Sequence, residues 1–359
     1  MLLIISEYFG EKDGPAGIVV EKAIKAFENA GVNFCLISSG RQKKNENYLK
    51  VKRYLLDYPR LRYYEDSYYI KKTGHPKVGS WGYRALHAAK KKFADKKWTA
   101  IIAWSNPISS LYVGLYLKGN KEIPLLWRCD DPYPPYNYPS APGWKPPSKH
   151  KEFENEWLKS NLDKITAISA PNEMLAQWMV EKLSFKKRCV VWPHYGGTIT
   201  NELDYQKSVK VKLDQQCLNI AYLGRLSDNR NPEPLLEAIK THNGDSLSII
   251  LHVFGSIHKN WVKAINAGVK SGYVKKYGEV NYKESLVIMK EFDALLLIEA
   301  NFECGIFLPS KFCDYISVKK PMLIATSKNS VVEKIVGHTY PGLIGYDHDI
   351  MCQFQVILY

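Results

Sequence analysis

The 359-residue sequence lacks the features of several common protein classes. No window approaches the ~18 consecutive apolar residues that a bilayer-spanning helix needs. The opening MLLIISEYFG is too short for a signal peptide and lacks its basic start, so we expect a buried first strand and a cytoplasmic protein. The seven cysteines show no metal-type pair spacing, which predicts reduced thiols and no bound metal. Internal repeats and low-complexity tracts are also absent.

The composition is that of a soluble globular protein, with 45% apolar and 24% charged residues. The length exceeds the roughly 250–300 residues that one hydrophobic core supports, so we expect two domains. Short apolar runs alternate with helical patterns in both halves, which predicts two doubly wound α/β domains. The polar stretch 198–216 has no clear period, and it is predicted to link a domain at 1–197 to a domain at 217–359.

The net charge of +14 is concentrated in one window. Residues 41–97 hold 17 lysines and arginines against 5 acidic residues, and tyrosines are interleaved among them. Basic and aromatic side chains together fit RNA, an anionic membrane surface or a phosphate-bearing substrate. A solvated surface with tyrosines packed beneath it explains the window about as well. RNP-like and helix-turn-helix patterns are absent, so nucleic acid is the least favoured partner.

The stretch 291–326 carries the clearest site pattern. Two apolar runs, Ala294–Ile298 and Met322–Ala325, flank a helical pattern. In a parallel strand–helix–strand unit the helix starts at the carboxyl edge of the sheet, where ligands bind and helix N–H groups favour phosphate. We therefore predict an anion or nucleotide site, although an ordinary βαβ unit with solvated polar residues fits the local pattern equally well. The helix is expected to have Pro309 in its first turn. The residues predicted to belong to the site are Pro309, Ser310, Lys311 and Asp314.

Two further loops follow predicted strands. The loop after Leu218–Leu223 contains Arg225 and Arg230, which would form a clamp for a diphosphate because arginine binds phosphate bidentately. The loop Glu7–Gly17 ends in Gly14-Pro-Ala-Gly17, and its glycines would let backbone N–H groups approach a ligand closely. A plain connecting loop explains that second pattern about as well.

Adjacent carboxylates, Asp130 and Asp131, follow the strand predicted at Pro124–Trp127 and precede a Pro-rich loop at 132–147. Loops in such positions commonly carry binding groups, so we favour a site there over a simple turn cap. His194 is a lone histidine beside a glycine turn. A structural role is favoured for it over a catalytic one.

In order and spacing, these elements resemble the GT-B fold retaining glycosyltransferases of the group 1 family, which includes enzymes of bacterial polysaccharide and lipopolysaccharide biosynthesis. The resemblance covers most of the chain and rests on LLWRCDDPYP, VVWPHYGG, AYLGRLSDNRNPEPLLEAI and PSKFCDYISVKKPMLIAT. It implies two Rossmann-like domains that face each other across a cleft. The first would bind the acceptor and the second the nucleotide sugar.

The resemblance also assigns residues. Arg225 matches the arginine of the family's GRL motif, and Arg230 stands where the family has a lysine; both would neutralise the leaving diphosphate. Asp314 aligns with the second glutamate of the E-x7-E motif, which accepts hydrogen bonds from ribose. The remaining assignments are Gly224, Gly305, Pro309, Ser310 and Lys311 for the nucleotide sugar, Gly14 and Gly17 for its phosphates, and Asp130 or Asp131 for orienting a sugar.

The implied reaction is hexosyl transfer from a UDP- or GDP-linked sugar to a glycan or polyprenyl-linked acceptor, with retention of configuration. No DxD motif stands in a suitable place, so no metal or other cofactor is expected. The acceptor would place the protein at the inner face of the cytoplasmic membrane, with 41–97 on the anionic lipid.

The sequence departs from the family pattern in two places. Ile306 occupies the position of the first motif glutamate, and aspartate replaces the second at Asp314. The last residues, HDIMCQFQVILY, do not resemble the crossing helix that ends the family's second domain, so that domain is expected to be shortened. These departures suggest an alternative, in which the protein is a non-catalytic nucleotide-sugar-binding partner of another transferase.

Overall fold

The computed structural model describes residues 1–40, 45–55, 58–75, 78–105, 107–133, 151–198, 208–244 and 248–345. Among these residues, the contacts divide the chain into two compact units, with the division between His194 and Tyr195. Most of the Pro-rich loop 132–147, part of the polar stretch 198–216 and the final HDIMCQFQVILY lie outside the described residues.

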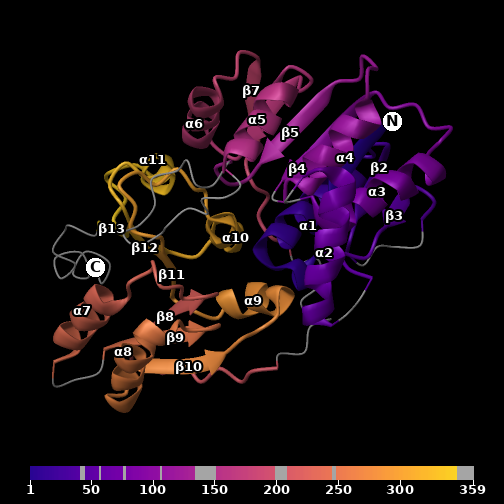
Figure 1. The fold of residues 1–359 in the computed structure, drawn as a ribbon. Coiled ribbons are helices and arrows are strands. Elements are labelled where there is room, and N and C mark those ends of the chain that lie inside the picture. The colour runs from indigo at the N-terminus through magenta and orange to yellow at the C-terminus, as the bar shows by residue number, and fades with distance from the viewer. Residues whose placement is uncertain are drawn as a thin grey trace. The chain divides into compact units, whose positions relative to one another are not determined.

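The first unit contains a seven-stranded parallel sheet in the order β3-β2-β1-β4-β5-β6-β7 (Figure 1). Its core strands are continuous apolar runs because both faces of the sheet are covered by helices. The strands are β1 (Leu2–Ser6), β2 (Phe34–Ser38), β3 (Tyr48–Lys50), β4 (Ala100–Ser105), β5 (Leu125–Cys129), β6 (Ala167–Ala170) and β7 (Arg188–Val191).

Helices connect these strands in turn. The helix α6 begins after Asn172, whose side chain accepts a hydrogen bond from the backbone N–H of Leu175 and caps the helix. The helical elements are the 3₁₀ helix η1 (Glu11–Asp13), α1 (Gly14–Asn29), α2 (Pro59–Thr73), α3 (Gly79–Lys92), α4 (Ser109–Lys118), α5 (Lys151–Leu162) and α6 (Glu173–Leu183).

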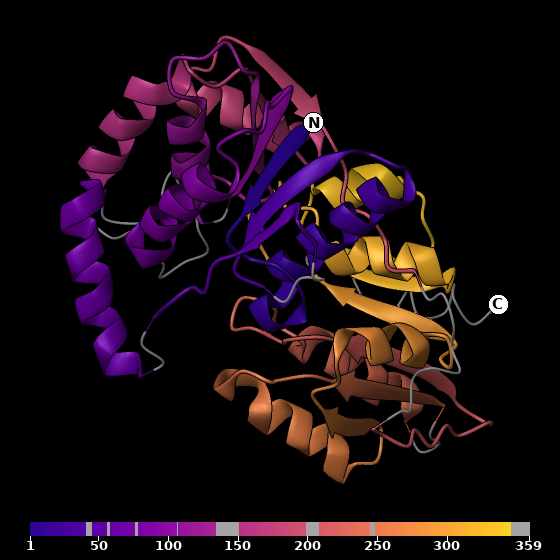
Figure 2. The ribbon, with the colours of Figure 1, turned by 90° about the vertical axis from the view of Figure 1, so that its right-hand side faces the viewer.

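The second unit contains a six-stranded parallel sheet in the order β10-β9-β8-β11-β12-β13 (Figures 1 and 2). The helix α7 packs on α8, and α9 packs on α10. The elements are β8 (Leu218–Leu223), α7 (Glu233–Asn243), β9 (Ile249–Phe254), α8 (Lys259–Lys270), β10 (Val274–Gly278), α9 (Tyr282–Met289), β11 (Ala294–Ile298), α10 (Ser310–Val318), β12 (Met322–Thr326), α11 (Val331–Val336) and β13 (Leu343–Gly345).

Each sheet has one point where the strand order reverses. The reversal falls between β1 and β4 in the first unit and between β8 and β11 in the second. Connections on the two sides of such a point leave the sheet in opposite directions. Ligands of open α/β sheets bind at this point, beyond the carboxyl ends of the strands. The fold therefore directs attention to the loops after β1, β4, β8 and β11.

Two predicted helix starts differ from the structure. The loop expected at Glu7–Gly17 is shorter, because η1 occupies Glu11–Asp13 and α1 already begins at Gly14. Pro15 suits the first helical turn, since it lacks only an N–H that would have no helical partner there. Pro309 was expected in the first turn of α10, but it is the N-cap residue, with an extended backbone at φ −63° and ψ 127°.

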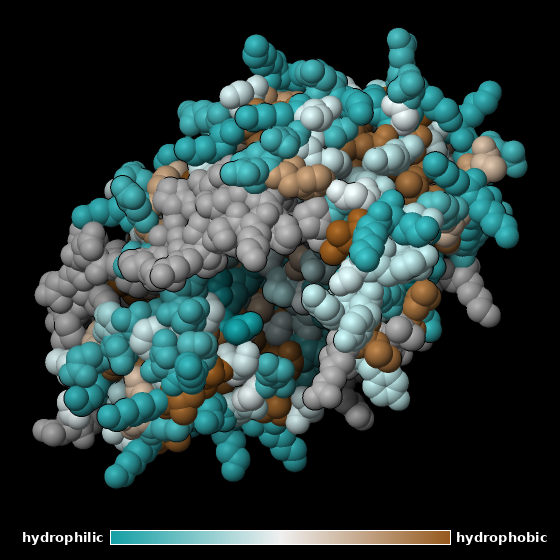
Figure 3. Space-filling model, in the orientation of Figure 1, coloured by the Kyte–Doolittle hydropathy of each residue, from teal (hydrophilic) through white to brown (hydrophobic). Residues whose placement is uncertain are grey.

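On the face shown in Figure 3, most of the coloured side chains are hydrophilic, and hydrophobic ones are scattered among them. Within the described ranges, no helix is long and apolar enough to cross a membrane.

Candidate functional site

The candidate site of the second unit lies at the carboxyl ends of β8 and β11. The loop after β8 is hydrogen-bonded to the loop after β9, because Leu226 N–H donates to the Ser256 carbonyl (2.9 Å) and His258 N–H to the Leu226 carbonyl (2.9 Å). The loop after β11 joins them, since Asn301 N–H donates to the Asn229 carbonyl at 3.3 Å. The three loops therefore form one connected layer above the strand ends.

Glycines let this layer approach the strands closely. Gly224 has a φ of +120°, a conformation that L side chains rarely adopt, and a Cβ atom there would lie 2.7 Å from Nζ of Lys311. A Cβ atom on Gly255 would lie 2.3 Å from the carbonyl oxygen of Gly224. The space above the end of β8 is thus reserved for the side chain of Lys311.

Lys311 reaches from the first turn of α10 back to β8. Its Nζ donates a hydrogen bond to the Leu223 carbonyl oxygen at 2.9 Å and lies 4.6 Å from the centre of the Tyr222 ring. Burial and the nearby positive charge of Arg230 lower the pKa of Lys311 to about 7. The sequence predicted Lys311 at the helix start, but it did not predict the contact with β8.

Arg230 and Lys311 are brought close together. Arg230 Nη1 donates to the carbonyl oxygen of Arg225 at 3.3 Å, and its Nε is buried without a hydrogen-bond partner among the described residues. The side chain of Arg225 is exposed on the same loop. Arg230 therefore lies near enough to Lys311 for its charge to act on the ammonium group, and Arg225 stays accessible on the same loop as Arg230.

Glu299 is a member of this site that the sequence analysis missed. It directly follows β11, it is buried, and its Oε2 accepts a hydrogen bond from Oγ1 of Thr326. Burial raises the pKa of Glu299 to about 7, although its hydrogen bonds and Arg230 act in the opposite direction. The position of Glu299 could have revealed it in the sequence, since an acidic residue directly after a buried apolar run lies at the carboxyl edge of the sheet.

The loop between β11 and α10 is packed against the next helix. The Gly305 carbonyl oxygen accepts a hydrogen bond from Val331 N–H at 2.8 Å, and a Cβ atom on Gly305 would lie 2.7 Å from Cβ of Ser330. Ile306, which stands in place of the family's glutamate, is buried. Ser310 is the first residue of α10, so its backbone N–H belongs to the helix start.

Asp314 has a structural task that the sequence did not reveal. Its side chain is 4% exposed, and Oδ1 accepts hydrogen bonds from Gly197 N–H (2.7 Å) and from the Tyr282 hydroxyl (2.8 Å). Cβ atoms on Gly196 and Gly197 would lie 1.7 Å from Oγ of Ser317 and 2.5 Å from the Tyr282 hydroxyl. Asp314 thus holds a glycine pair that packs closely on α9 and α10. Its contact with ribose stays a prediction.

In the first unit, Asp130 belongs to a buried ion pair. Its Oδ1 accepts from Nε of Arg128 at 2.7 Å and its Oδ2 from Nε1 of Trp104 at 2.5 Å. The Arg128 guanidinium lies 5.4 Å and 5.1 Å from the ring centres of Trp104 and Trp192. Asp131 is exposed. These contacts give Asp130 a structural role, and the catalytic assignments of both aspartates stay predictions.

His194 lies beside this ion pair, with Nδ1 3.9 Å from Oδ1 of Asp130. Burial lowers the pKa of His194 to about 4, although Asp130 acts in the opposite direction, so the imidazole is neutral at pH 7. A buried neutral imidazole fits the structural role that the sequence favoured.

Gly14 and Gly17 lie at the start of α1. The Gly17 carbonyl oxygen accepts from Gly10 N–H at 2.9 Å, and a Cβ atom on Gly17 would lie 2.3 Å from the Gly10 carbonyl oxygen. Gly14 has a φ of +67° and no neighbour within 4 Å of a Cβ position. Gly17 is therefore required for close packing of the turn, whereas Gly14 is required for its backbone conformation.

A second acidic group in the first unit was also missed. Glu7 directly follows β1 and is buried, with Oε1 3.1 Å from Nε of Arg53 and Oε2 accepting from the Ser109 hydroxyl. Burial raises the pKa of Glu7 to about 7, against the effects of Ser109 and Arg53. Arg53 also binds Asp13 at 2.7 Å. The polar groups after β1 and β4 thus form a connected cluster.

Comparison with known protein structures identifies the fold to which the chain belongs. No protein-family model matches the chain, and no curated protein sequence matches it. Its structure is similar to those of sucrose-phosphate synthase from Thermosynechococcus elongatus (TM-score 0.66, 14% identity, 99% of this chain and 89% of that one) and HepE from Anabaena in complex with UDP (0.59, 11%, 99% and 89%). The lipopolysaccharide outer core galactosyltransferase WaaB, without ligand, is similar as well (0.57, 16%, 100% and 90%).

These similarities extend over nearly the whole chain and show that it has the GT-B glycosyltransferase fold. The fold class predicted from the sequence is thereby confirmed. At 11–16% identity the comparison concerns the fold alone.

Proposed function

We propose that the protein is a glycosyltransferase that uses a nucleotide-sugar donor. The observation that carries this proposal is the meeting of Arg230 and Lys311 beside the start of α10, at the strand-order reversal of the second unit. Two cations and the N–H groups of a helix start together favour a diphosphate. The GT-B fold and the complexes of HepE with UDP and UDP-glucose support the same reading.

The proposed chemistry follows from the charges. The leaving nucleoside diphosphate gains negative charge as the glycosidic bond breaks, so cations that meet it stabilise the transition state more than the bound donor. Arg225 would reach the diphosphate from the exposed side of the loop, and Arg230 and Lys311 from beneath. On the resemblance to the group 1 family we also propose retention of configuration and an acceptor that is a glycan or a lipid-linked sugar.

The donor is proposed to be a UDP-sugar, because similar structures hold UDP and UDP-glucose. Binding of UDP-glucose, UDP-galactose, UDP-N-acetylglucosamine and GDP-mannose to the purified chain would rank the donors. A clear preference for the GDP-sugar would contradict the choice of base.

The substitution Arg225→Ala tests the site. Removing one cation from a leaving diphosphate should lower kcat/KM for donor hydrolysis or transfer by about 10²–10³-fold. Because Arg225 is exposed, the free energy of unfolding should change by less than about 0.5 kcal/mol. The assay should proceed in EDTA, since we propose that no divalent metal takes part.

The control is Arg188→Ala, which removes an equally exposed arginine from β7 of the first unit. Its kcat/KM should match that of the unchanged protein. Equal turnover by Arg225→Ala and the unchanged protein would overturn the site assignment.

One observation favours a second function. Asp314 already accepts hydrogen bonds from Gly197 and Tyr282, and buried Ile306 stands where the family has an acidic residue. A protein with these features could bind a nucleotide sugar without transferring the sugar. Tight UDP-sugar binding with neither transfer nor slow hydrolysis would support this non-catalytic partner over the enzyme.

A further inference from the structure

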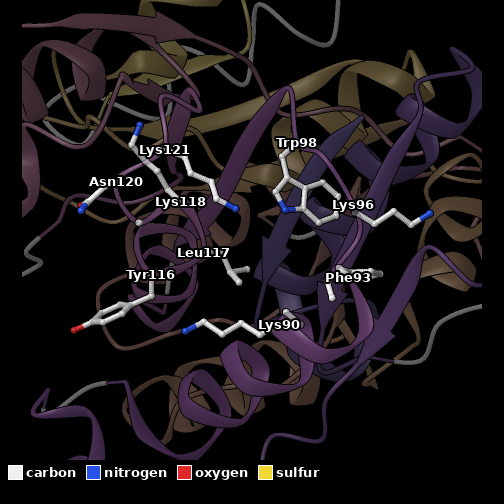
Figure 4. A pocket seen from close by; sticks show the side chains of 12 residues that line it. Lys90, Phe93, Lys96, Trp98, Tyr116, Leu117, Lys118, Asn120 and Lys121 are labelled. Atoms are coloured by element: carbon white, nitrogen blue, oxygen red, sulfur yellow. The ribbon is translucent and has the colours of Figure 1, made fainter.

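A hollow lies in the first unit, away from the loops described above. It is bordered by the carboxyl-terminal ends of α3 and α4 and by the turns that follow them, with a volume of about 290 Å³ (Figure 4). In a parallel sheet, each connecting helix runs back from the carboxyl edge to the amino edge. The hollow therefore lies at the amino edge of the sheet, before β4 and β5. The polar cluster after β1 and β4 lies at the opposite, carboxyl edge.

Four lysines line this hollow, and no acidic side chain does. The ammonium groups of three of them form no hydrogen bond or ion pair with any residue that the structure describes. These three are Lys90, Lys96 and Lys121.

The fourth, Lys118, donates to the Ile123 carbonyl oxygen at 2.5 Å. Burial lowers the pKa of Lys118, and Lys187 lowers it further, whereas Glu122 raises it. An anion in the hollow would relieve this clustering of positive charge.

Helix ends explain only part of the cluster. Lysines in the last turn of a helix interact favourably with its negative end, which accounts for Lys90 in α3 and Lys118 in α4. Lys96 and Lys121 follow the helices instead and also line the hollow, so the helix ends do not account for them. The arrangement therefore suits a bound anion better than it suits helix capping alone.

Apart from Asn120, the rest of the lining is aromatic or apolar. Trp98 packs edge-on against Phe93, with ring centres 5.6 Å apart, and Tyr116 is 51% exposed. In Figure 4, the side chain of Leu117 lies between Tyr116 and Trp98. Flat, half-exposed rings offer a surface to the apolar face of a small ring-shaped ligand.

We propose that this hollow binds a phosphorylated monosaccharide. Lysines bind phosphate as point charges, whereas arginines would select a fixed bidentate geometry, so four lysines fit a freely rotating phosphate ester. The volume of about 290 Å³ lies just below the roughly 300–1,000 Å³ of small-molecule sites, which suits a ligand as small as one sugar ring with its phosphate. The site is separate from the proposed donor site and does not depend on it.

The test is calorimetric titration of the full chain with glucose 6-phosphate at saturating UDP, which occupies the proposed donor site. We expect saturable binding to one site. In the Lys90→Gln/Lys121→Gln double variant, loss of two charge-assisted contacts should raise Kd at least about tenfold. The control double variant, Lys263→Gln/Lys270→Gln, removes the same charge from exposed positions of α8 and should leave Kd unchanged.

Two further probes separate the parts of the ligand. Glucose should not bind detectably, because it lacks the anion. Inorganic phosphate should bind at least about tenfold more weakly than glucose 6-phosphate, because it cannot contact Trp98 and Tyr116. Absence of saturable binding, equal Kd values for the two double variants, or equal binding of phosphate and glucose 6-phosphate would each overturn the proposal.

Discussion

Lys311 shows how burial can turn a lysine into a group that titrates near neutral pH. Its pKa is lowered from 10.5 to about 7, so a large part of the population is uncharged at pH 8. A bound diphosphate favours the charged form and raises the pKa again. We therefore predict that UDP binding at pH 8 takes up a proton.

Calorimetry of UDP binding in buffers of different ionisation enthalpy measures this uptake directly. The variant Lys311→Met should bind UDP without it, whereas Lys334→Met, which changes an exposed lysine of α11, should retain it. A binding enthalpy that is independent of the buffer in the unchanged protein would contradict the prediction.

The same pKa predicts a change of stability with pH. Between about pH 7 and pH 10.5 the unfolded chain binds more protons at position 311 than the folded one, so the free energy of unfolding should rise with pH across this window. The variant Lys311→Met lacks this contribution, and it has all other titratable groups in common with the unchanged protein. Denaturant titrations at pH 7 and pH 10 should therefore show a smaller rise for the variant, and an equal rise would exclude a lowered pKa.

Residue types alone predicted part of each site. The sequence identified Arg225, Arg230 and Lys311 because cations in a loop after a strand or at a helix start are recognisable without a structure. It missed Glu7 and Glu299, because a pKa near 7 results from burial, and burial of a single polar side chain is a property of the packed unit. It also assigned only ribose binding to Asp314, although the carboxylate holds Gly197.

At the scale of elements, the start of α1 allows a test of two glycines with different tasks. Gly17→Ala would place a methyl group 2.3 Å from the Gly10 carbonyl oxygen, which should cost about 1–3 kcal/mol and displace the turn. Gly14→Ala meets no neighbour, but φ +67° with ψ −156° is a conformation open essentially to glycine alone, which should cost about 1–3 kcal/mol without displacement of the turn. Denaturant unfolding measures both costs.

Hydrogen exchange distinguishes the two effects. The Gly10 amide, which is bonded to the Gly17 carbonyl, should exchange faster in Gly17→Ala and stay protected in Gly14→Ala. Gly31→Ala is the control for backbone conformation, since it has the same φ of +67° and an equally open surrounding. Equal protection of Gly10 in all three variants would show that the turn accommodates the methyl group.

The helix α2 tests the proposed membrane surface. The sequence left open whether its tyrosines pack beneath a solvated surface, but Tyr63 and Tyr64 are 73% and 69% exposed. Exposed tyrosines on a helix that also carries Arg62, Lys71 and Lys72 suit an anionic bilayer interface. We predict that the protein floats with phosphatidylserine vesicles at low salt, and that high salt weakens the binding.

The double variant Tyr63→Ser/Tyr64→Ser should bind these vesicles more weakly. The control Val262→Ser/Val269→Ser changes exposed apolar side chains of α8 and should bind like the unchanged protein. Flotation that does not respond to salt, or that is equal in the two variants, would argue against a membrane role for α2.

Strands could be predicted from the sequence where nearly every residue of the strand is buried. The runs Leu218–Leu223 and Ala294–Ile298 coincide with β8 and β11, because strands covered on both faces read as unbroken apolar stretches. Helix starts were less predictable. The pair Gly14–Pro15 is typical of a loop in sequence, although α1 begins at Gly14. The close packing of Gly17 on Gly10 belongs to this helix start and is visible only in the structure.

For the molecule as a whole, ligand protection should reveal which unit binds the donor. We predict that UDP slows hydrogen exchange in the loops 224–231 and 299–311, which carry the cations and the helix start. Uridine, which lacks the diphosphate, should protect 224–231 much less. Exchange in both loops that is unchanged by UDP would contradict the proposed donor site.

The two-unit α/β architecture was predictable as a whole, because alternating strands and helices constrain the topology strongly. The place where the chain passes from one unit to the next was harder to predict. Gly196 and Gly197 look like a turn in sequence, but their close packing on α10 and α9 assigns them to the second unit. These contacts of the glycine pair involve residues more than 80 positions away and leave no local pattern.

The outermost strands of the two sheets also bear on self-association. An uncovered edge strand can pair with the edge of another copy and start an aggregate, and charged side chains, lysine above all, prevent this. The edges β3, β7 and β10 carry Lys50, Arg188 and the pair Lys275–Lys276. Part of the excess positive charge therefore stands where it would oppose strand addition, whether or not any ligand is bound.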